Sequence, residues 1–137
     1  MNQADIDLAR HRFRKAHDHL KSAQILFDAE MYDDSLSRSY YAMFAAARAL
    51  LALKQLDSKK HSGVLSLFNP PFVKTGIFAR AAGRSISKTR IRRESSDYTD
   101  FYLVSREEAE TQLEAAENFI TTIETAFEKI VACRGKQ

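Results

Sequence analysis

Apolar residues recur at alternating spacings of three and four along three long segments of the chain, and no other sequence feature constrains the fold as strongly. An α-helix places such residues on one face, which must be buried against a neighbour. The first stripe comprises Ile6, Ala9, Phe13, Ala16, Leu20, Ala23 and Phe27. The second comprises Leu36, Tyr40, Met43, Ala47 and Leu50, and the third comprises Ala109, Leu113, Ala116, Ile120, Ile123, Phe127 and Ile130. The period therefore predicts three long amphipathic helices.

Local signals indicate where these helices begin. Asp33 or Asp34 is expected to cap the second helix, because a carboxylate at that position accepts backbone N–H groups that lack a partner in the first turn. The last helix is expected to open at Ser105 with the capping-box sequence Ser105-Arg106-Glu107-Glu108. In such a box the hydroxyl and the carboxylate satisfy each other's backbone donors.

The segment between the second and third stripes is expected to add two helices. Residues 61–68 predict a short helix that ends before Asn69-Pro70-Pro71, and residues 75–98 predict a longer helix weakened by Gly83. No stretch longer than Phe72–Phe78 has the pattern of a strand. We therefore expect an all-α, antiparallel up-and-down four-helix bundle with a short extra helix, formed by a single domain over residues 1–137.

Composition limits the class of protein. With 137 residues, 45% of them hydrophobic, the chain can bury one core without disulfide or metal support. The single cysteine, Cys133, cannot form an internal disulfide, which fits a reducing compartment. The most apolar segment, Tyr40–Leu53, contains Arg48 and is too short to span a bilayer. Charged residues within positions 5–12 interrupt any apolar leader. We expect a cytoplasmic protein that does not bind membranes.

Charge is distributed unevenly along the chain. The formal net charge is +3, but the segment from Arg80 to Arg93 contains six cations and no acid. A second basic cluster, Arg10, Arg12, Arg14 and Lys15, lies near the start, and seven glutamates lie between Glu107 and Glu128. Two interpretations fit the basic run: a solvated helix face and a surface that binds an anion such as RNA.

The sequence does not predict a metal or a cofactor. His11, His17 and His19 lack the spacing of three or four that would put two ligands on one face of a helix, and the single cysteine adds no zinc motif. The chain contains neither Gly-x-Gly-x-x-Gly nor the Walker spacing.

Three segments together resemble the HEPN domain in its small stand-alone prokaryotic form. They are YDDSLSRSYYAMFAAARALL, KKHSGVLSLFNPPFVKTG and RRESSDY, and the resemblance extends from about residue 4 to residue 126. It implies an all-α up-and-down bundle that usually dimerises and is often encoded beside a small nucleotidyltransferase as a toxin–antitoxin pair. Many such proteins are metal-independent ribonucleases. Their motif is an arginine followed, after four to six residues, by a histidine, and two motifs face each other across the dimer cleft.

On this sequence, the motif arginine corresponds to Arg93 and the histidine position holds Tyr98. No histidine follows His61, and the position at which another family pattern has a further tyrosine is Asp100. Histidine titrates near pH 6.5 and tyrosine near pH 10, so Tyr98 is a poor general base at neutral pH. Arg93 keeps its charge and can hold a phosphate bidentately. The resemblance thus implies a phosphate-facing site with weak or absent ribonuclease activity.

The remaining candidate residues each have two interpretations. Asp97 is spaced i,i+4 from Arg93, so it either orients that arginine in a site or forms a surface ion pair. His61 either supplies the missing base or is a polar residue at a helix start. The phosphate- or RNA-binding candidates are Lys88, Arg90, Arg92 and Arg93. Tyr40 and Tyr41 are expected to pack between helices.

The sequence leaves three hypotheses for function. The first is a toxin–antitoxin component that acts with a nucleotidyltransferase and has little or no nuclease activity. The second is a metal-independent endoribonuclease toxin with an active composite site at the dimer cleft. The third is a helical module that retains the dimer and partner surfaces without catalysis. The partners expected are a second copy of the chain, a minimal nucleotidyltransferase and RNA.

Overall fold

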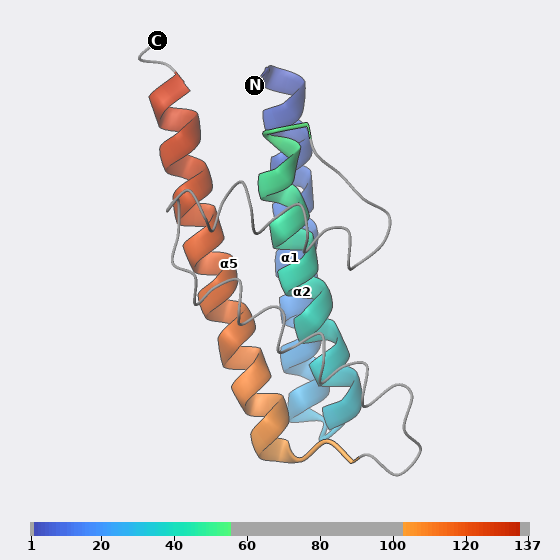
Figure 1. Cartoon of the computed structure of the whole chain (residues 1–137). Coiled ribbons are helices and arrows are strands. Elements are labelled where there is room, and N and C mark those ends of the chain that lie inside the picture. Colours follow the sequence, from blue (N-terminus) through green and yellow to red (C-terminus); the bar gives the residue numbers. More distant parts are fainter. Residues whose placement is uncertain (1, 56–102, 135–137) are drawn as a thin grey trace.

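The structure is a computed structural model that describes residues 2–55 and 103–134. These residues form helices α1 (Gln3–Asp28), α2 (Tyr32–Ala52) and α5 (Arg106–Arg134) and include no strand. The helices lie side by side, and α1 runs antiparallel to both α2 and α5 (Figure 1). The all-α fold predicted from the apolar period is therefore confirmed. The helices expected at 61–68 and 75–98 lie outside the described residues.

Capping side chains fix the start of two helices. The side chain of Asn2 accepts the backbone N–H of Asp5 at 2.9 Å, and the carboxylate of Asp5 accepts the N–H of Asn2 at 3.1 Å. This box was not anticipated, although an Asn followed three residues later by an Asp is a recognisable variant of its signal. At α5, the Oγ atom of Ser105 accepts the N–H of Glu108 at 3.1 Å. The serine half of the predicted capping box is confirmed.

The expected cap of α2 was wrong. The helix begins at Tyr32, its N-cap position is Met31, and no side chain caps it. Asp33 and Asp34 lie instead within the first turn, where their negative charge is favourable beside the positive end of the helix dipole. The reason for the early start is the turn before it. Glu30 adopts a left-handed φ of 63°, which reverses the chain and allows α2 to begin at once.

The predicted stripes form the core. Large side chains from all three helices meet there, and the rings of Phe13 on α1 and Phe127 on α5 lie 5.0 Å apart between centroids. Helix α2 is buried on more than one side, since Ala42, Ala46 and Ala49 are inaccessible along with its stripe. Small residues at these positions permit close helix contact. Within the described residues, no helix is both long enough and apolar enough to span a bilayer.

Candidate functional site

The sequence-predicted site residues all lie in one part of the chain. They fall outside the described residues 2–55 and 103–134, and they are His61, Lys88, Arg90, Arg92, Arg93, Asp97 and Tyr98. The tyrosines of α2, in contrast, are placed. Tyr40 is fully buried and Tyr41 is partly buried, with their rings 5.8 Å apart between centroids. Tyr41 packs against α1 as expected, with its ring 5.8 Å from that of His19 between centroids. Tyr40 is buried, and its ring neighbours include Tyr41 and Phe44 of the same helix.

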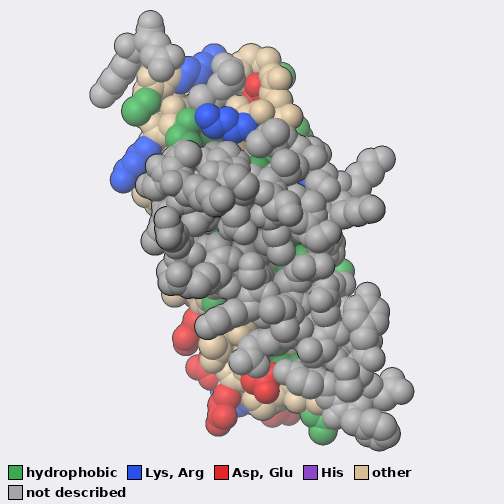
Figure 2. Space-filling model, in the orientation of Figure 1, with side chains coloured by type: hydrophobic (Ala, Val, Ile, Leu, Met, Phe, Trp, Pro, Cys, Tyr) green, Lys and Arg blue, Asp and Glu red, His purple; other side chains and the backbone are tan. Residues whose placement is uncertain are grey.

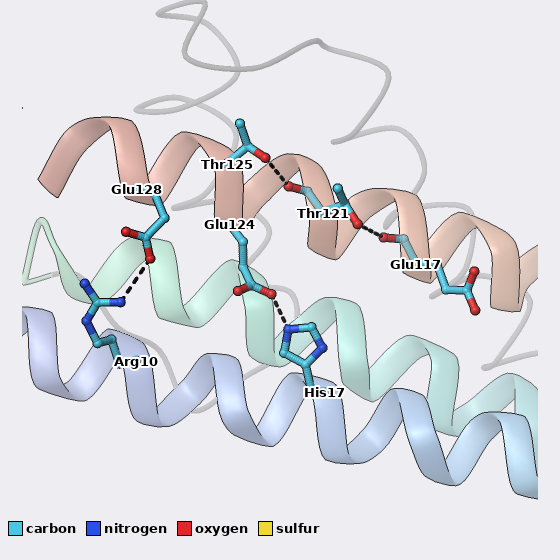
Figure 3. Close-up of polar contacts among 7 residues, drawn as sticks. All are labelled: Arg10, His17, Glu117, Thr121, Glu124, Thr125 and Glu128. Carbon is cyan, nitrogen blue, oxygen red and sulfur yellow. Dashed lines mark hydrogen bonds and ion pairs between the residues drawn. The ribbon is translucent and has the colours of Figure 1, made fainter. Parts of the chain in front are cut away.

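Charged side chains pair across the contact between α1 and α5. The Nη1 atom of Arg10 lies 2.9 Å from Oε1 of Glu128, and one turn of α5 earlier Glu124 contacts Nε2 of His17 (Figure 3). The guanidinium of Arg10 also lies 5.0 Å from the centre of the Phe127 ring. Each basic group drawn on this seam meets a carboxylate. These two pairs join α1 to α5 and therefore have a structural role.

The contact between α1 and α2 has a different character. Nη1 of Arg38 lies 3.3 Å from Nδ1 of His19, and the His19 ring lies 5.8 Å from the ring of Tyr41 between centroids. Further along the seam, Arg12 donates to the backbone carbonyl of Arg48 at 3.2 Å. Cations and aromatic rings thus alternate along this contact, which is a composition found at surfaces that bind nucleic acids.

The pKa of His19 is lowered from 6.5, first by partial burial and then by the positive charges of Arg38 and Lys15, while Asp18 opposes the shift. The neutral imidazole is therefore favoured near pH 7. Arginine can only donate hydrogen bonds, so Nδ1 of His19 is the acceptor and the ring proton belongs on Nε2. At neutral pH this histidine is a hydrogen-bond donor beside a guanidinium.

Sequence reasoning missed this cluster. It weighed the three N-terminal histidines only as metal ligands, and it treated the N-terminal cations only as a charge cluster. The signal that could have found the cluster is the spacing of Arg12, Lys15 and His19, which are three and four residues apart and share one face of a helix. Within the described ranges, no three His, Cys, Asp or Glu side chains converge as metal ligands would.

The carboxylates gather elsewhere. Figure 2 shows acidic side chains near the lower end of the molecule, where α5 begins, and Lys and Arg side chains near the upper end. A shallow pocket of about 290 Å³ at the α1–α2 turn is lined by Glu30, Asp33 and Asp34 together with Met31 and Leu103. Like charges repel, so this pocket disfavours a phosphate. The cationic α1–α2 seam is better suited to an anion.

The described helices define an all-α protein in which α2 and α5 run antiparallel to α1. The family model of the HEPN domain matches residues 9–126. The chain therefore belongs to the HEPN domain family, as the three sequence segments indicated.

Curated relatives resemble this chain in sequence, and a solved structure resembles it in fold. The chain is 40% identical over 116 residues to "Putative toxin MJ0605" of Methanocaldococcus jannaschii, covering 85% of this chain and 86% of that protein. It is 34% identical to a UPF0332 protein of Thermotoga maritima, covering 85% and 89%. The crystal structure of TT1696 from Thermus thermophilus matches with a TM-score of 0.69 at 21% identity, over 86% of this chain and 97% of that one. That likeness shows the shared fold.

Proposed function

We propose that this protein is the HEPN component of a prokaryotic toxin–antitoxin module, that it acts in the cytoplasm with a small nucleotidyltransferase, and that its own ribonuclease activity is weak or absent. The observation that carries the proposal is the combination of HEPN family membership with a tyrosine, Tyr98, at the position of the motif histidine. The toxin names carried by two Methanocaldococcus jannaschii relatives support the toxin–antitoxin context.

The site of the proposed function is the segment Arg93-Glu94-Ser95-Ser96-Asp97-Tyr98. Arg93 anchors an RNA phosphate, because a guanidinium presents several N–H donors in a fixed plane and stays charged. Asp97 orients Arg93. Cleavage of RNA without a metal requires a base for the 2′-hydroxyl proton, and tyrosine, which titrates near pH 10, is largely protonated at neutral pH. Lys88, Arg90 and Arg92 add phosphate contacts.

The test is single-turnover cleavage of a structured RNA in EDTA, which also examines metal independence. Weak or no cleavage by the wild type is expected, and Tyr98→His should increase it because histidine restores a base that titrates near the working pH. Arg93→Ala should abolish whatever cleavage exists. Robust wild-type cleavage that Arg93→Ala leaves intact would show that this site assignment is wrong.

The second candidate function is an active metal-independent endoribonuclease toxin. The presence of His61 directly after Lys59 and Lys60 favours it, since a histidine beside cationic residues within the matched family region could supply the base that the Arg93 motif lacks. The same assay separates the two functions. Robust wild-type cleavage that is lost in His61→Ala would establish this candidate and identify the base.

The proposed assembly is a homodimer bound to the nucleotidyltransferase. A composite site at a dimer cleft requires two copies of the chain, so light scattering at micromolar concentration should give twice the mass of one chain, 15.6 kDa. Detection of monomer alone at that concentration would exclude a shared cleft. Co-purification with the product of an adjacent nucleotidyltransferase gene examines the partner separately.

A further inference from the structure

Two histidines of α1 differ in the charge that faces them. His17 faces α5, and its Nε2 atom contacts the carboxylate of Glu124 (Figure 3). His19, two positions further along, faces α2, where the group that reaches its Nδ1 atom is the Arg38 guanidinium at 3.3 Å. Among the described residues, no carboxylate lies within ion-pair distance of Arg38. At this point of the α1–α2 seam, a guanidinium therefore reaches an imidazole directly, and Asp18 on α1 is the carboxylate whose charge acts on the ring.

This arrangement disfavours a second positive charge. Partial burial, and then the positive charges of Arg38 and Lys15, lower the pKa of His19, so the neutral imidazole that accepts from Arg38 is favoured over the imidazolium. Lys15 lies four residues before His19 on the same side of α1 and contributes to the shift. Groups held in an unfavourable electrostatic environment are enriched at functional sites, where a ligand supplies the missing charge.

We propose that Lys15, His19 and Arg38 form a binding site for a phosphate group, carried either by a free nucleotide or by an RNA strand. Three kinds of donor are available on this part of the seam, since Lys15 lies one turn of α1 before His19. Arg38 has further N–H groups beyond the one directed at His19, the neutral imidazole of His19 has its proton on Nε2, and Lys15 adds a mobile ammonium. The ring of Tyr41 lies beside His19 and limits the positions that its imidazole can take.

This site uses other residues than the proposed Arg93 site, and it does not require that RNA be cleaved. A phosphate bound beside His19 stabilises the protonated imidazole. It therefore raises the pKa of His19, against the lowering produced by Arg38 and Lys15. The charged groups that face the ring are Arg38 on α2 and Lys15 and Asp18 on α1, with the Tyr41 phenol on α2.

The test follows the imidazole C–H signals by NMR during a pH titration of the full chain, with the His19 signal assigned from the His19→Gln variant. The probes are 5′-AMP and oligouridylate. We expect the pKa of His19 to rise with at least one probe, while the imidazole signals of His17, which contacts Glu124 on α5, change less when the probe is added. A response to 5′-AMP alone identifies a free nucleotide as the ligand, and a response to oligouridylate identifies an RNA strand.

A pair of variants makes the result specific. Arg38→Ala removes an exposed guanidinium and should weaken binding of the responding probe about tenfold or more, as expected for loss of a charge-assisted hydrogen bond. Lys21→Ala removes an equal charge from an exposed position on another face of α1 and should leave the affinity unchanged. Circular dichroism checks that both variants are folded. Equal weakening by both variants, or a His19 signal that ignores both probes at millimolar concentration, would overturn the proposal.

Discussion

The hydroxyl of Ser35 on α2 donates a 2.8 Å hydrogen bond to the backbone carbonyl of Ala23 on α1. Both residues are fully buried. Ala23 lies near the end of α1 and Ser35 near the start of α2, so the bond joins the two helices close to the turn that connects them. A buried hydroxyl is costly without a partner, and this contact supplies one. It also fixes how far α2 can slide along α1.

Ser35→Ala should lower the free energy of unfolding by about 1 kcal/mol, because it removes one buried hydrogen bond while leaving the Ala23 carbonyl available to its own helix. Ser37→Ala is the matched control, since it makes the same chemical change on the partly exposed side of α2. It should alter stability by less than about 0.5 kcal/mol. Urea denaturation of both variants measures the difference, and equal effects would mean that the Ser35 bond contributes nothing specific.

The ion pair between Arg10 and Glu128 should contribute little to stability. The side chains are 45% and 57% exposed, so solvent screens their 2.9 Å contact. A double-mutant cycle with Arg10→Ala and Glu128→Ala should give a coupling energy of about 0.2–1 kcal/mol that shrinks as salt is added. The contact of Arg10 with the Phe127 ring does not enter the coupling energy, because it is lost equally when Arg10 is replaced in the wild type and in the Glu128→Ala variant.

Arg10→Ala combined with Glu117→Ala provides the control cycle for this measurement. Glu117 is an exposed glutamate of the same helix, about three turns away from Glu128. Its coupling to Arg10 should be close to zero. A coupling above about 2 kcal/mol for the Arg10–Glu128 pair would show that the pair is less screened than its exposure indicates.

The apolar period predicted the helices well, because a stripe every three or four residues is stable only when one face is covered. Ala109, Ala116 and Ile123 of the last stripe are fully buried, and Phe127 is 1% exposed. Leu20 and Phe27 of the first stripe are only partly buried. A stripe indicates which side of a helix is apolar. It does not indicate how much of that side a neighbour covers.

The polar contacts were harder to predict, because the apolar period does not show which side chains of a neighbouring helix lie opposite. His17 and His19 differ by two positions, and the period places them on opposite sides of α1. It cannot show that a glutamate meets one and an arginine the other, because both partners come from helices distant in sequence. The start of α2 was also misplaced, since the left-handed residue Glu30 is not a glycine and gave no signal for the turn.

His19 should make stability depend on pH. Its pKa is lowered from 6.5 in the fold, so the unfolded chain binds this proton at a higher pH than the folded chain does. The stabilising contribution is therefore fully present above pH 6.5 and is lost as the pH falls through the lowered pKa of the folded state. The pKa of Asp5 is lowered from 3.8, chiefly by its hydrogen bond with the Asn2 backbone. Asp5 therefore affects stability in a separate, more acidic pH range.

Urea unfolding at a series of pH values below 6.5 measures this effect. His19→Gln should flatten the pH dependence in that range, because glutamine does not titrate. Arg38→Ala removes one cause of the shift and should flatten the dependence in part, while the burial of the ring remains. A slope that both variants leave unchanged would assign the pH dependence to other groups.

RNA binding, if it uses the basic run, should depend steeply on salt. A Lys or Arg that contacts a phosphate releases a condensed counterion, and each contact to a single strand adds about 0.7 to the slope of log affinity against log salt concentration. The triple variant Arg90→Ala, Arg92→Ala, Arg93→Ala removes three candidate contacts and should reduce that slope by about 2.

The control for this prediction is the triple variant Lys21→Ala, Lys54→Ala, Lys129→Ala, which removes the same net charge from exposed positions of the described helices and their ends. Fluorescence anisotropy with labelled oligouridylate at several salt concentrations gives both slopes. If contact, and not net charge, determines binding, only the first variant flattens the slope. An unchanged slope in that variant would identify the run from Arg80 to Arg93 as a solvated face.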